Sequence, residues 1–174
     1  FELLLVRHGD AEDDAPGGDA ARALTEPGQA AIRRVGAALE RLELTWSEAW
    51  TSPYLRAKQT SALIHEALAP QHEAREGQAL PAPQETDTLV VYGDATRAAR
   101  HLIKRGWRQH GPRPCIAAFG HEPNLSSVAS LLLGGDAGAV RLSWGRGDVM
   151  HLLVPAPSHF DQVLAPQAEE PLPH

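Results

Sequence analysis

The sequence predicts an α/β sandwich of three layers, in which helices cover both faces of a mostly parallel central sheet. Short, almost continuous apolar runs of strand length alternate with longer segments whose apolar residues repeat at helical spacing. Continuous apolar runs are typical of strands that are buried on both faces, as in parallel sheets. The regular alternation of strand and helix is typical of the α/β class. The two clearest apolar runs, residues 2–6 and 115–119, each stop at a polar motif that contains histidine and glycine.

The first half of the chain predicts two strand–helix units. Thr25 is a suitable N-cap and Pro27 fits the first turn, so a helix is expected to begin there. The intervening loop is acidic and rich in glycine and proline. The predicted order is a strand at 2–6, a loop at 10–23, a helix at 25–42, a weaker strand at 46–51 and a helix at 54–68.

The second half is less regular at its start. Residues 69–93 hold several prolines and show no clean period, so we predict an irregular segment with a short strand near 88–91. Asp94 and Asn124 are candidate N-caps for two further helices. The later elements are predicted as a helix at 95–107, a strand at 115–119, a helix at 125–133 and a hairpin of strands at 140–142 and 149–154.

Composition and length indicate one globular domain. The chain has 174 residues, of which 43% are hydrophobic and 22% charged, and these values exclude fibrous and disordered classes. We assign residues 1–154 to a single domain and residues 155–174 to a proline-rich, acidic tail at the surface. The single cysteine can form no internal disulfide, and no apolar run approaches the length of a membrane span. We therefore expect a cytoplasmic protein with no membrane partner.

The net charge indicates which kinds of partner the protein binds. A formal net charge of −6 argues against a nucleic-acid partner, because proteins that bind nucleic acid normally present a basic face to the phosphates. A small anionic substrate is compatible with this charge, since the planar fork of a single arginine suits phosphate oxygens. Individual arginines must therefore be judged by their position.

The candidate site lies at the carboxyl ends of the predicted strands. Arg7-His8-Gly9 follows the first strand, and Gly120-His121 follows the strand at 115–119. Arg56 lies near the start of the helix that follows the second strand. Ligands of open α/β sheets bind at this edge, so we expect these side chains to converge. Two arginines and two histidines would form an anion pocket with charge-assisted hydrogen bonds to a phosphate.

These motifs resemble those of the histidine phosphatase superfamily, whose signature is the triplet Arg7-His8-Gly9 after the first strand. The segment from Ser52 to Thr60 (SPYLRAKQT) is similar to the second-arginine motif of the family, and Gly120-His121-Glu-Pro-Asn is similar to its second-histidine motif. Leu24-Thr25 followed by Gly28 also fits. Over residues 2–154 the chain most resembles the small phosphohistidine phosphatases of the SixA type, so a phosphoglycerate mutase-like fold without a large cap domain is expected.

The resemblance implies a covalent mechanism without metal or cofactor. His8 would attack phosphorus, the leaving group would depart in line, and water would hydrolyse the phosphohistidine. Arg7, Arg56 and His121 would neutralise the equatorial oxygens, and Gly9 would leave room for the phosphate. By the same resemblance Arg22 matches an arginine near the phosphate. His8 must be neutral to attack, and nearby arginines would lower its pKa.

The sequence also bears on the leaving group. Relatives that act on phosphate esters carry a general-acid carboxylate and cap insertions between the second helix and the strand at 115–119. Here that region is short, and its candidate acids, Glu85, Asp87 and Asp94, match no motif. A leaving alkoxide needs a proton far more than a leaving imidazole does. A weak or missing acid therefore favours phosphohistidine as the substrate.

Three functions follow from these observations. The first is a phosphatase for protein phosphohistidine, with a histidine phosphotransfer domain or a phosphocarrier as partner. The second is a phosphomonoesterase for a small phosphorylated metabolite, which would need one of the three acids at the phosphate. The third is a phosphohistidine-binding module without turnover, although such a module has no need of a nucleophile at His8.

Overall fold

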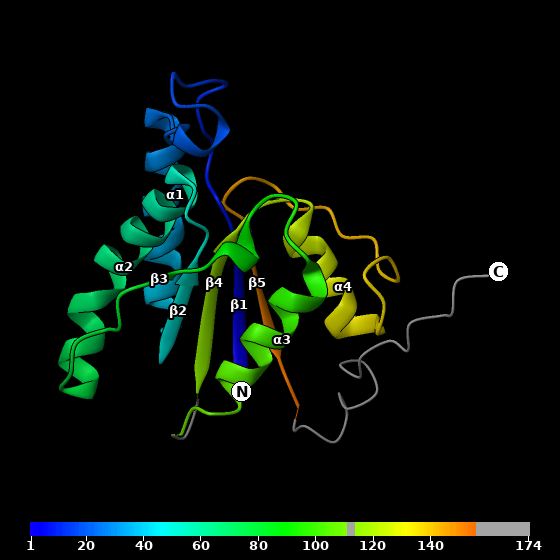
Figure 1. Ribbon diagram of the computed structural model, residues 1–174. Helices are drawn as coiled ribbons and strands as arrows, with labels where there is room; N and C mark the ends of the chain where they lie inside the picture. The colour runs from blue at the N-terminus through cyan, green and yellow to red at the C-terminus, as the bar shows by residue number, and fades with distance from the viewer. Residues whose placement is uncertain (111–113, 156–174) are drawn as a thin grey trace.

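The computed structural model describes residues 1–110 and 114–155. Its five-stranded sheet has the order β3-β2-β4-β1-β5 (Figure 1). The strands are β1 (Glu2–Arg7), β2 (Glu48–Thr51), β3 (Gln84–Glu85), β4 (Cys115–Gly120) and β5 (Val149–Leu153). The first four are parallel, and β5 joins β1 in antiparallel pairing. The predicted α/β fold with a mostly parallel sheet is thus confirmed.

Helices cover both faces of this sheet. They are α1 (Glu26–Arg41), α2 (Leu55–Glu76), α3 (Ala95–Gly106) and α4 (Asn124–Gly134), with short 3-10 turns η1 (Asp19–Ala21) and η2 (Asp87–Leu89). Figure 1 shows α1 and α2 on one face and α3 and α4 on the other. In the part of the chain that is described, no large cap domain is present.

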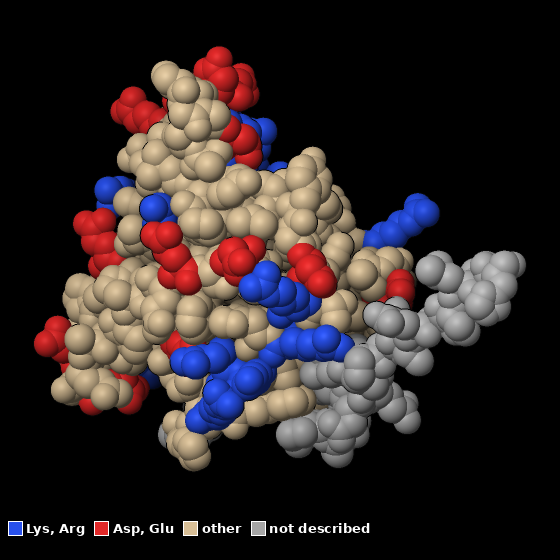
Figure 2. All heavy atoms as spheres, viewed as in Figure 1, with Lys and Arg blue, Asp and Glu red and all other residues tan. Residues whose placement is uncertain are grey.

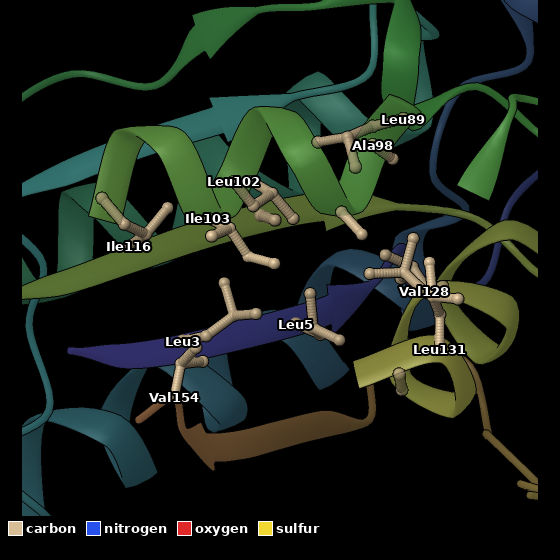
Figure 3. Close-up of a cluster of buried hydrophobic side chains, with 14 of the residues drawn as sticks. Leu3, Leu5, Leu89, Ala98, Leu102, Ile103, Ile116, Val128, Leu131 and Val154 are labelled. Carbon is tan, nitrogen blue, oxygen red and sulfur yellow. The ribbon is translucent and has the colours of Figure 1, made fainter. Parts of the chain in front are cut away.

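The hydrophobic core has two parts, one on each face of the sheet, and alternate residues of β1 belong to each part. Leu3 and Leu5 pack with α3 and α4 (Figure 3), whereas Leu4 and Val6 pack with α1 and α2. Successive strand residues point to opposite faces, so a continuous apolar run serves both layers. Each of these side chains is at most 1% exposed. Complete burial stabilises the fold by about 1.5–3 kcal/mol for each such side chain.

Helix α2 is longer than the sequence predicts. The expected end was residue 68, but the helix continues through Pro70 to Glu76 and ends at Gly77, which has a left-handed backbone with φ 69°. A proline inside a helix removes one hydrogen bond and usually costs about 3 kcal/mol. Burial of Leu68, two residues before Pro70, offsets part of this cost, because its apolar side chain is fully buried.

Two predicted strands are wrong. Residues 140–142 form no strand, so β5 has no hairpin partner there, and it pairs instead with the free edge of β1. Residues 88–91 form no strand either, because η2 occupies residues 87–89. The two-residue strand β3 lies earlier, at Gln84–Glu85, next to β2. Short strands of this kind follow the available sheet edge rather than a local hydrophobic pattern.

The predicted helix caps have different outcomes. Thr25 and Asp94 cap α1 and α3, and their side chains accept hydrogen bonds from the N–H groups three residues later. Asn124 does not cap α4. Its amide donates instead to the carbonyl of Thr88, at 3.3 Å, and the N-cap position is occupied by Pro123. A tertiary contact with η2 therefore replaces the local cap.

The predicted C-terminal tail lies outside the described residues, apart from Pro155. Within the described ranges, no helix is both long enough and apolar enough to cross a membrane. Charge is unevenly distributed: Figure 2 shows lysine and arginine side chains gathered over α3, which contributes Arg97, Arg100, Lys104 and Arg105. This surface is separate from the arginines of the strand-end motifs.

Candidate active site

Three parallel strands bring the candidate residues to one edge of the sheet. β1 and β4 are in register so that Arg7 lies beside Gly120, and the N–H of His8 donates to the carbonyl of Gly120 at 3.0 Å. Ser52 follows β2 in the same way, since its N–H donates to the carbonyl of Phe119 at 2.9 Å. His8, Ser52 and His121 therefore all lie just beyond the end of their strands.

The ring of His8 is held in one tautomer. Its Nδ1 lies 2.7 Å from the carbonyl oxygen of Gly9, which can only accept a hydrogen bond, so Nδ1 carries the proton. The Nε2 lone pair then accepts a hydrogen bond from the Nε–H of Arg56 at 3.3 Å. A neutral imidazole whose Nε2 carries no proton can attack a phosphoryl group once this hydrogen bond is released.

Thr60 fixes the distance between His8 and Arg56. Its hydroxyl oxygen accepts from the N–H of Gly9, at 3.1 Å, and donates to the carbonyl of Arg56, at 2.8 Å. Thr60 and Arg56 are four residues apart on α2 and so lie on the same helix face. The loop after β1 is thereby attached to the first turn of α2. Gly9 also lets the loop pack closely against α1, because a Cβ there would lie 2.7 Å from Ile32 Cγ1.

His121 faces His8 and is oriented by Ser52. The two imidazole centroids are 4.9 Å apart, and His121 Nε2 lies 2.9 Å from Ser52 Oγ. Ser52 Oγ already accepts from the N–H of Tyr54, so its own proton can be donated to His121 Nε2. That arrangement leaves the imidazole proton on His121 Nδ1, which has no partner among the described residues. In this tautomer His121 Nδ1 is a buried N–H donor without a protein partner among the described residues.

Both histidines are neutral near pH 7. The pKa of His8 is lowered to about 4, chiefly by burial and also by the charges of Arg56, Arg7 and Arg146, while the hydrogen bond to Gly9 opposes the shift. Burial also lowers the pKa of His121 to about 3, with smaller contributions from His8, Arg56 and Arg7. A burial penalty acts on the charged form of a group, so it favours the unprotonated imidazole.

Arg56 is buried and fully engaged. Its side chain is 3% exposed, Nη1 donates to the carbonyl of Asp19 at 2.6 Å, and Nη2 pairs with the carboxylate of Asp19 at 3.0 Å. Arg22 binds the other oxygen of the same carboxylate at 2.7 Å. Burial opposes ionisation of Asp19, but hydrogen bonds from Arg22 and Arg56 outweigh it and lower its pKa. Asp19 therefore stands as an anion between two arginines that are candidates for binding phosphate.

Arg7 approaches the two histidines from the β5 side. Its Nη1 donates to the carbonyl of Trp144, and its Nε is buried without a partner among the described residues. The backbone N–H of Arg7 donates to the carbonyl of Asp148 at 3.0 Å. The predicted set His8, Arg7, Arg56 and His121 is thus gathered at one place, with Arg22 joined to it through Asp19.

The three candidate acids have other partners. Glu85 pairs with Lys58 at 3.2 Å, Asp87 with Arg97 at 3.3 Å, and Asp94 caps α3. Across residues 1–110 and 114–155, no hydrogen bond or ion pair joins any of them to His8. The carboxylate at the site is instead Asp19.

Sequence reasoning missed Asp19, Ser52 and Thr60 as members of the site. Ser52 and Thr60 lie inside the segment SPYLRAKQT, so their position in that motif was a usable signal. Asp19 lies in an acidic loop with several other carboxylates, and only its spacing of three residues from Arg22 distinguished it.

The sequence of the chain is similar to those of known proteins. Residues 3–80, which include His8 and Arg56, match the model of the histidine phosphatase superfamily (branch 1). An uncharacterised protein of Picosynechococcus sp. is 30% identical over 139 residues, covering 79% of this chain and 76% of that protein. The chain belongs to the histidine phosphatase superfamily.

Solved structures place the fold within the same group. The protein histidine phosphatase SixA complexed with tungstate superposes with a TM-score of 0.72 at 21% identity, covering 87% of this chain and 86% of that one. A mycobacterial glucosyl-3-phosphoglycerate phosphatase superposes with a TM-score of 0.64 at 14% identity, covering 87% of this chain and 89% of that one. The chain therefore has the phosphoglycerate mutase-like fold.

Proposed function

We propose that this protein is a phosphatase that hydrolyses protein phosphohistidine through a covalent intermediate on His8. The observation that carries the proposal is the tautomer of His8. Its Nδ1 is bonded to the Gly9 carbonyl, so the Nε2 lone pair faces the guanidinium of Arg56. A ring fixed in this way is a nucleophile, whereas a module that only binds phosphate would need donors alone.

The first step forms one bond and breaks another at phosphorus. The Nε2 lone pair of His8 attacks, a P–N bond forms to His8, and the P–N bond to the substrate breaks. The substrate, whose other ring nitrogen carries a proton, leaves as neutral imidazole. Arg56 and the Nδ1–H of His121 neutralise the charge on the equatorial oxygens. In the second step water attacks the phosphohistidine, the P–N bond to His8 breaks, and inorganic phosphate leaves. Neither step needs a metal or a cofactor in this scheme.

The phosphoryl group would bind an arginine that already has protein partners. Each of the three guanidinium nitrogens of Arg56 donates one hydrogen bond, two of them to Asp19. A phosphoryl oxygen can bind the second N–H of Nη1 or Nη2, or it can displace the Asp19 carboxylate. Arg22 can keep Asp19 in place during this exchange, because its guanidinium also binds the main-chain carbonyl of Glu12 at 2.5 Å.

The site favours a leaving group that needs little protonation. Asp19 is the carboxyl group that the structure places beside Arg56, and its pKa is lowered, so it is ionised at neutral pH. An ionised carboxylate cannot donate a proton to a leaving alkoxide. A departing imidazole needs far less help, because its conjugate acid has a pKa of about 6.5. This supports phosphohistidine over a phosphate ester.

A phosphatase for a small phosphorylated metabolite is the second candidate. The observation that favours it is the similarity of the fold to a phosphatase of glucosyl-3-phosphoglycerate over 87% of this chain. That reaction class would need a proton donor at the phosphate, and a rearrangement of Glu85, Asp87 or Asp94 would have to supply it. We also propose that residues 1–154 form a single domain of a cytoplasmic protein.

The test compares three substrates: a histidine-phosphorylated carrier protein, a phosphoserine peptide and an aryl phosphate. Wild type is expected to release phosphate from phosphohistidine well above the rate for either ester, and His8→Ala is expected to lose this activity. His151→Ala is the matched control, because His151 is a partly exposed histidine on β5 that pairs with Glu2. An acid-labile phosphoryl group trapped on wild type, and absent from His8→Ala, would identify the intermediate.

Each other outcome selects another function. Preference for an ester would overturn the phosphohistidine proposal in favour of the metabolite phosphatase. Phosphate binding without release from any substrate would favour the non-catalytic binding module. Full activity of His8→Ala would exclude the covalent mechanism.

A further inference from the structure

The rim of the site carries an arginine that the proposed chemistry does not use. Arg146 lies in the turn that precedes β5, and the N–H of the next residue, Gly147, donates to the carbonyl of His8 at 3.1 Å. The same turn accepts a hydrogen bond from the backbone of Arg7 through Asp148. The turn is therefore attached to the backbone of the two residues at the centre of the motif.

Asp10 holds Arg146 in place. Arg146 Nη1 pairs with Asp10 Oδ1, and Asp10 Oδ2 accepts from the hydroxyl of Thr25 at 3.2 Å. The carbonyl of Asp10 also accepts from the N–H of Thr25 at 3.0 Å. Thr25 is the N-cap of α1, so Asp10 is anchored to the start of a helix that packs on the sheet. Asp10 thereby holds the Arg146 side chain, which is otherwise flexible, in one orientation.

Arg146 keeps donors for a ligand. Its side chain is 51% exposed, and within the described residues Asp10 is its one ion-pair partner. A guanidinium presents five N–H donors in a planar fork, so one pairing with a carboxylate oxygen leaves others directed to solvent. Arg56 differs in this respect, because it is buried and all its nitrogens are engaged.

We propose that Arg146 binds a second anionic group of the substrate, separate from the phosphoryl group that is transferred. This inference rests on the proposed function and deepens it. In a protein substrate the group would be the carboxylate of an acidic side chain close to the phosphohistidine. In a small substrate a carboxylate or a second phosphate would present the same chemistry. Arg56 contacts the ring of His8 and the Arg146 turn contacts its backbone, so both cations lie within reach of one ligand.

The test uses three phosphohistidine peptides that differ at one position beside the phosphohistidine, carrying Glu, Gln or Lys. Wild type is expected to prefer Glu over Gln about two- to fivefold in kcat/KM, mainly through KM, as is typical of an exposed ion pair. Arg146→Gln should abolish this preference, and Arg146→Glu should reverse it in favour of Lys. Arg141→Gln is the matched control, an exposed arginine five residues earlier that should retain the preference.

Small substrates distinguish the source of the anion. Phosphoramidate has no second anionic group, whereas a phosphorylated hydroxy acid carries a carboxylate. If Arg146→Gln changes the ratio of kcat/KM between these two but not between the peptides, the anion belongs to a small substrate. The use of ratios removes any common effect of the substitution on His8.

The inference is overturned if wild type discriminates neither among the peptides nor between the small substrates, or if Arg146→Gln retains the preference of wild type. Failure of the proposed function has a different signature, because His8→Ala would then keep its activity or wild type would hydrolyse no phosphohistidine. Raised salt gives a further check, since it should weaken a preference that depends on an exposed charge.

Discussion

Two arginine–aspartate pairs flank His8, and they differ in burial. The inner pair joins Arg56, which is 3% exposed, to Asp19, and the rim pair joins Arg146, which is 51% exposed, to Asp10. Both guanidinium groups lower the pKa of His8. A buried charge depends on its partner, because leaving it unpaired is costly, whereas an exposed pair is weakened by water and salt. The same residue types therefore suit different tasks.

The two pairs are suited to bind different parts of a substrate. The inner pair has little freedom and is suited to binding a group whose geometry does not change, the phosphoryl group. The rim pair retains open donors and is suited to the variable part of a substrate. If the two pairs differ in this way, substitutions at the inner pair should have the largest effect on activity, and substitutions at the rim pair should have the smallest effect on stability.

Substitution of Arg56 should have the largest effect on activity. Arg56→Lys keeps the positive charge but loses the fork that reaches both His8 Nε2 and Asp19. We expect kcat/KM for a phosphohistidine substrate to fall on the order of 100- to 1,000-fold. Steady-state kinetics measure this, and circular dichroism verifies folding. Arg33→Lys, at an exposed ion pair with Glu66, is the control. A fall of less than tenfold would contradict a phosphate-binding role for Arg56.

Ser52→Ala should have the next largest effect. It removes the hydroxyl that we assign as the donor to His121 Nε2, so the proton is no longer directed to Nδ1. We expect kcat to fall about tenfold. Nitrogen-15 NMR of the imidazole should show a single tautomer in wild type and a mixture in the variant. Ser61→Ala, which removes a buried hydroxyl from the same region, should leave the His121 signals unchanged. The same tautomer in both proteins would remove Ser52 from this role.

The lowered pKa values predict how activity depends on pH. The pKa of His8 in the free protein is about 4, so the neutral nucleophile persists well below its ordinary value of 6.5. The acid limb of kcat/KM should therefore lie nearer 4 than 6.5. A limb near 6.5 would show that the ring is more readily protonated than its burial implies.

The same shifts predict how stability depends on pH. The folded pKa values of His8 and His121 lie below the unfolded value, so the unfolded chain binds more protons between pH 6.5 and 4. The free energy of unfolding should thus fall as pH is lowered through this window, by about 2–5 kcal/mol in total. Urea unfolding at several pH values measures this loss, and His121→Gln should reduce it. A loss that is equal in wild type and the variant would exclude His121 as a contributor.

Substitution at the rim should have the smallest effect on stability. Asp10→Asn breaks the exposed pair with Arg146. We expect the free energy of unfolding to fall by less than about 1 kcal/mol, with the difference reduced at high salt. Thermal or urea unfolding at two salt concentrations checks this. A loss of several kcal/mol would mean that the rim pair is structural, and the contrast with the inner pair would then be invalid.

Much of the fold could be predicted from the sequence because it depends on local pattern. The apolar run of β1 is buried on both faces, and the N-cap of α1 at Thr25 follows from its side chain alone. The motifs at Arg7-His8-Gly9 and Gly120-His121 also indicate the edge of the sheet at which the site forms, since parallel strands end together.

Other features depended on contacts between distant segments. Helix α2 continues past Pro70 because burial of its apolar face offsets the lost backbone hydrogen bond. Strand β5 pairs with β1 because that edge of the sheet is free. No local sequence pattern predicts the length of α2 or the pairing of β5. Asn124 likewise does not cap α4 as predicted, because its side-chain amide donates to the carbonyl of Thr88.

Local sequence pattern is sufficient to predict the order of the four helices and of β1, β2, β4 and β5, and it supplies the residue types at the strand ends. Only the tertiary structure decided which carboxylate meets which arginine, because Asp19 and Asp10 lie in the same loop region and are chemically alike. The two aspartates are similarly exposed, at 50% and 42%, but packing of α2 buries Arg56, whereas Arg146 in the turn before β5 stays exposed. Burial of this kind is a property of the folded chain, and it fixes both the neutral state of the histidines and the strength of each ion pair.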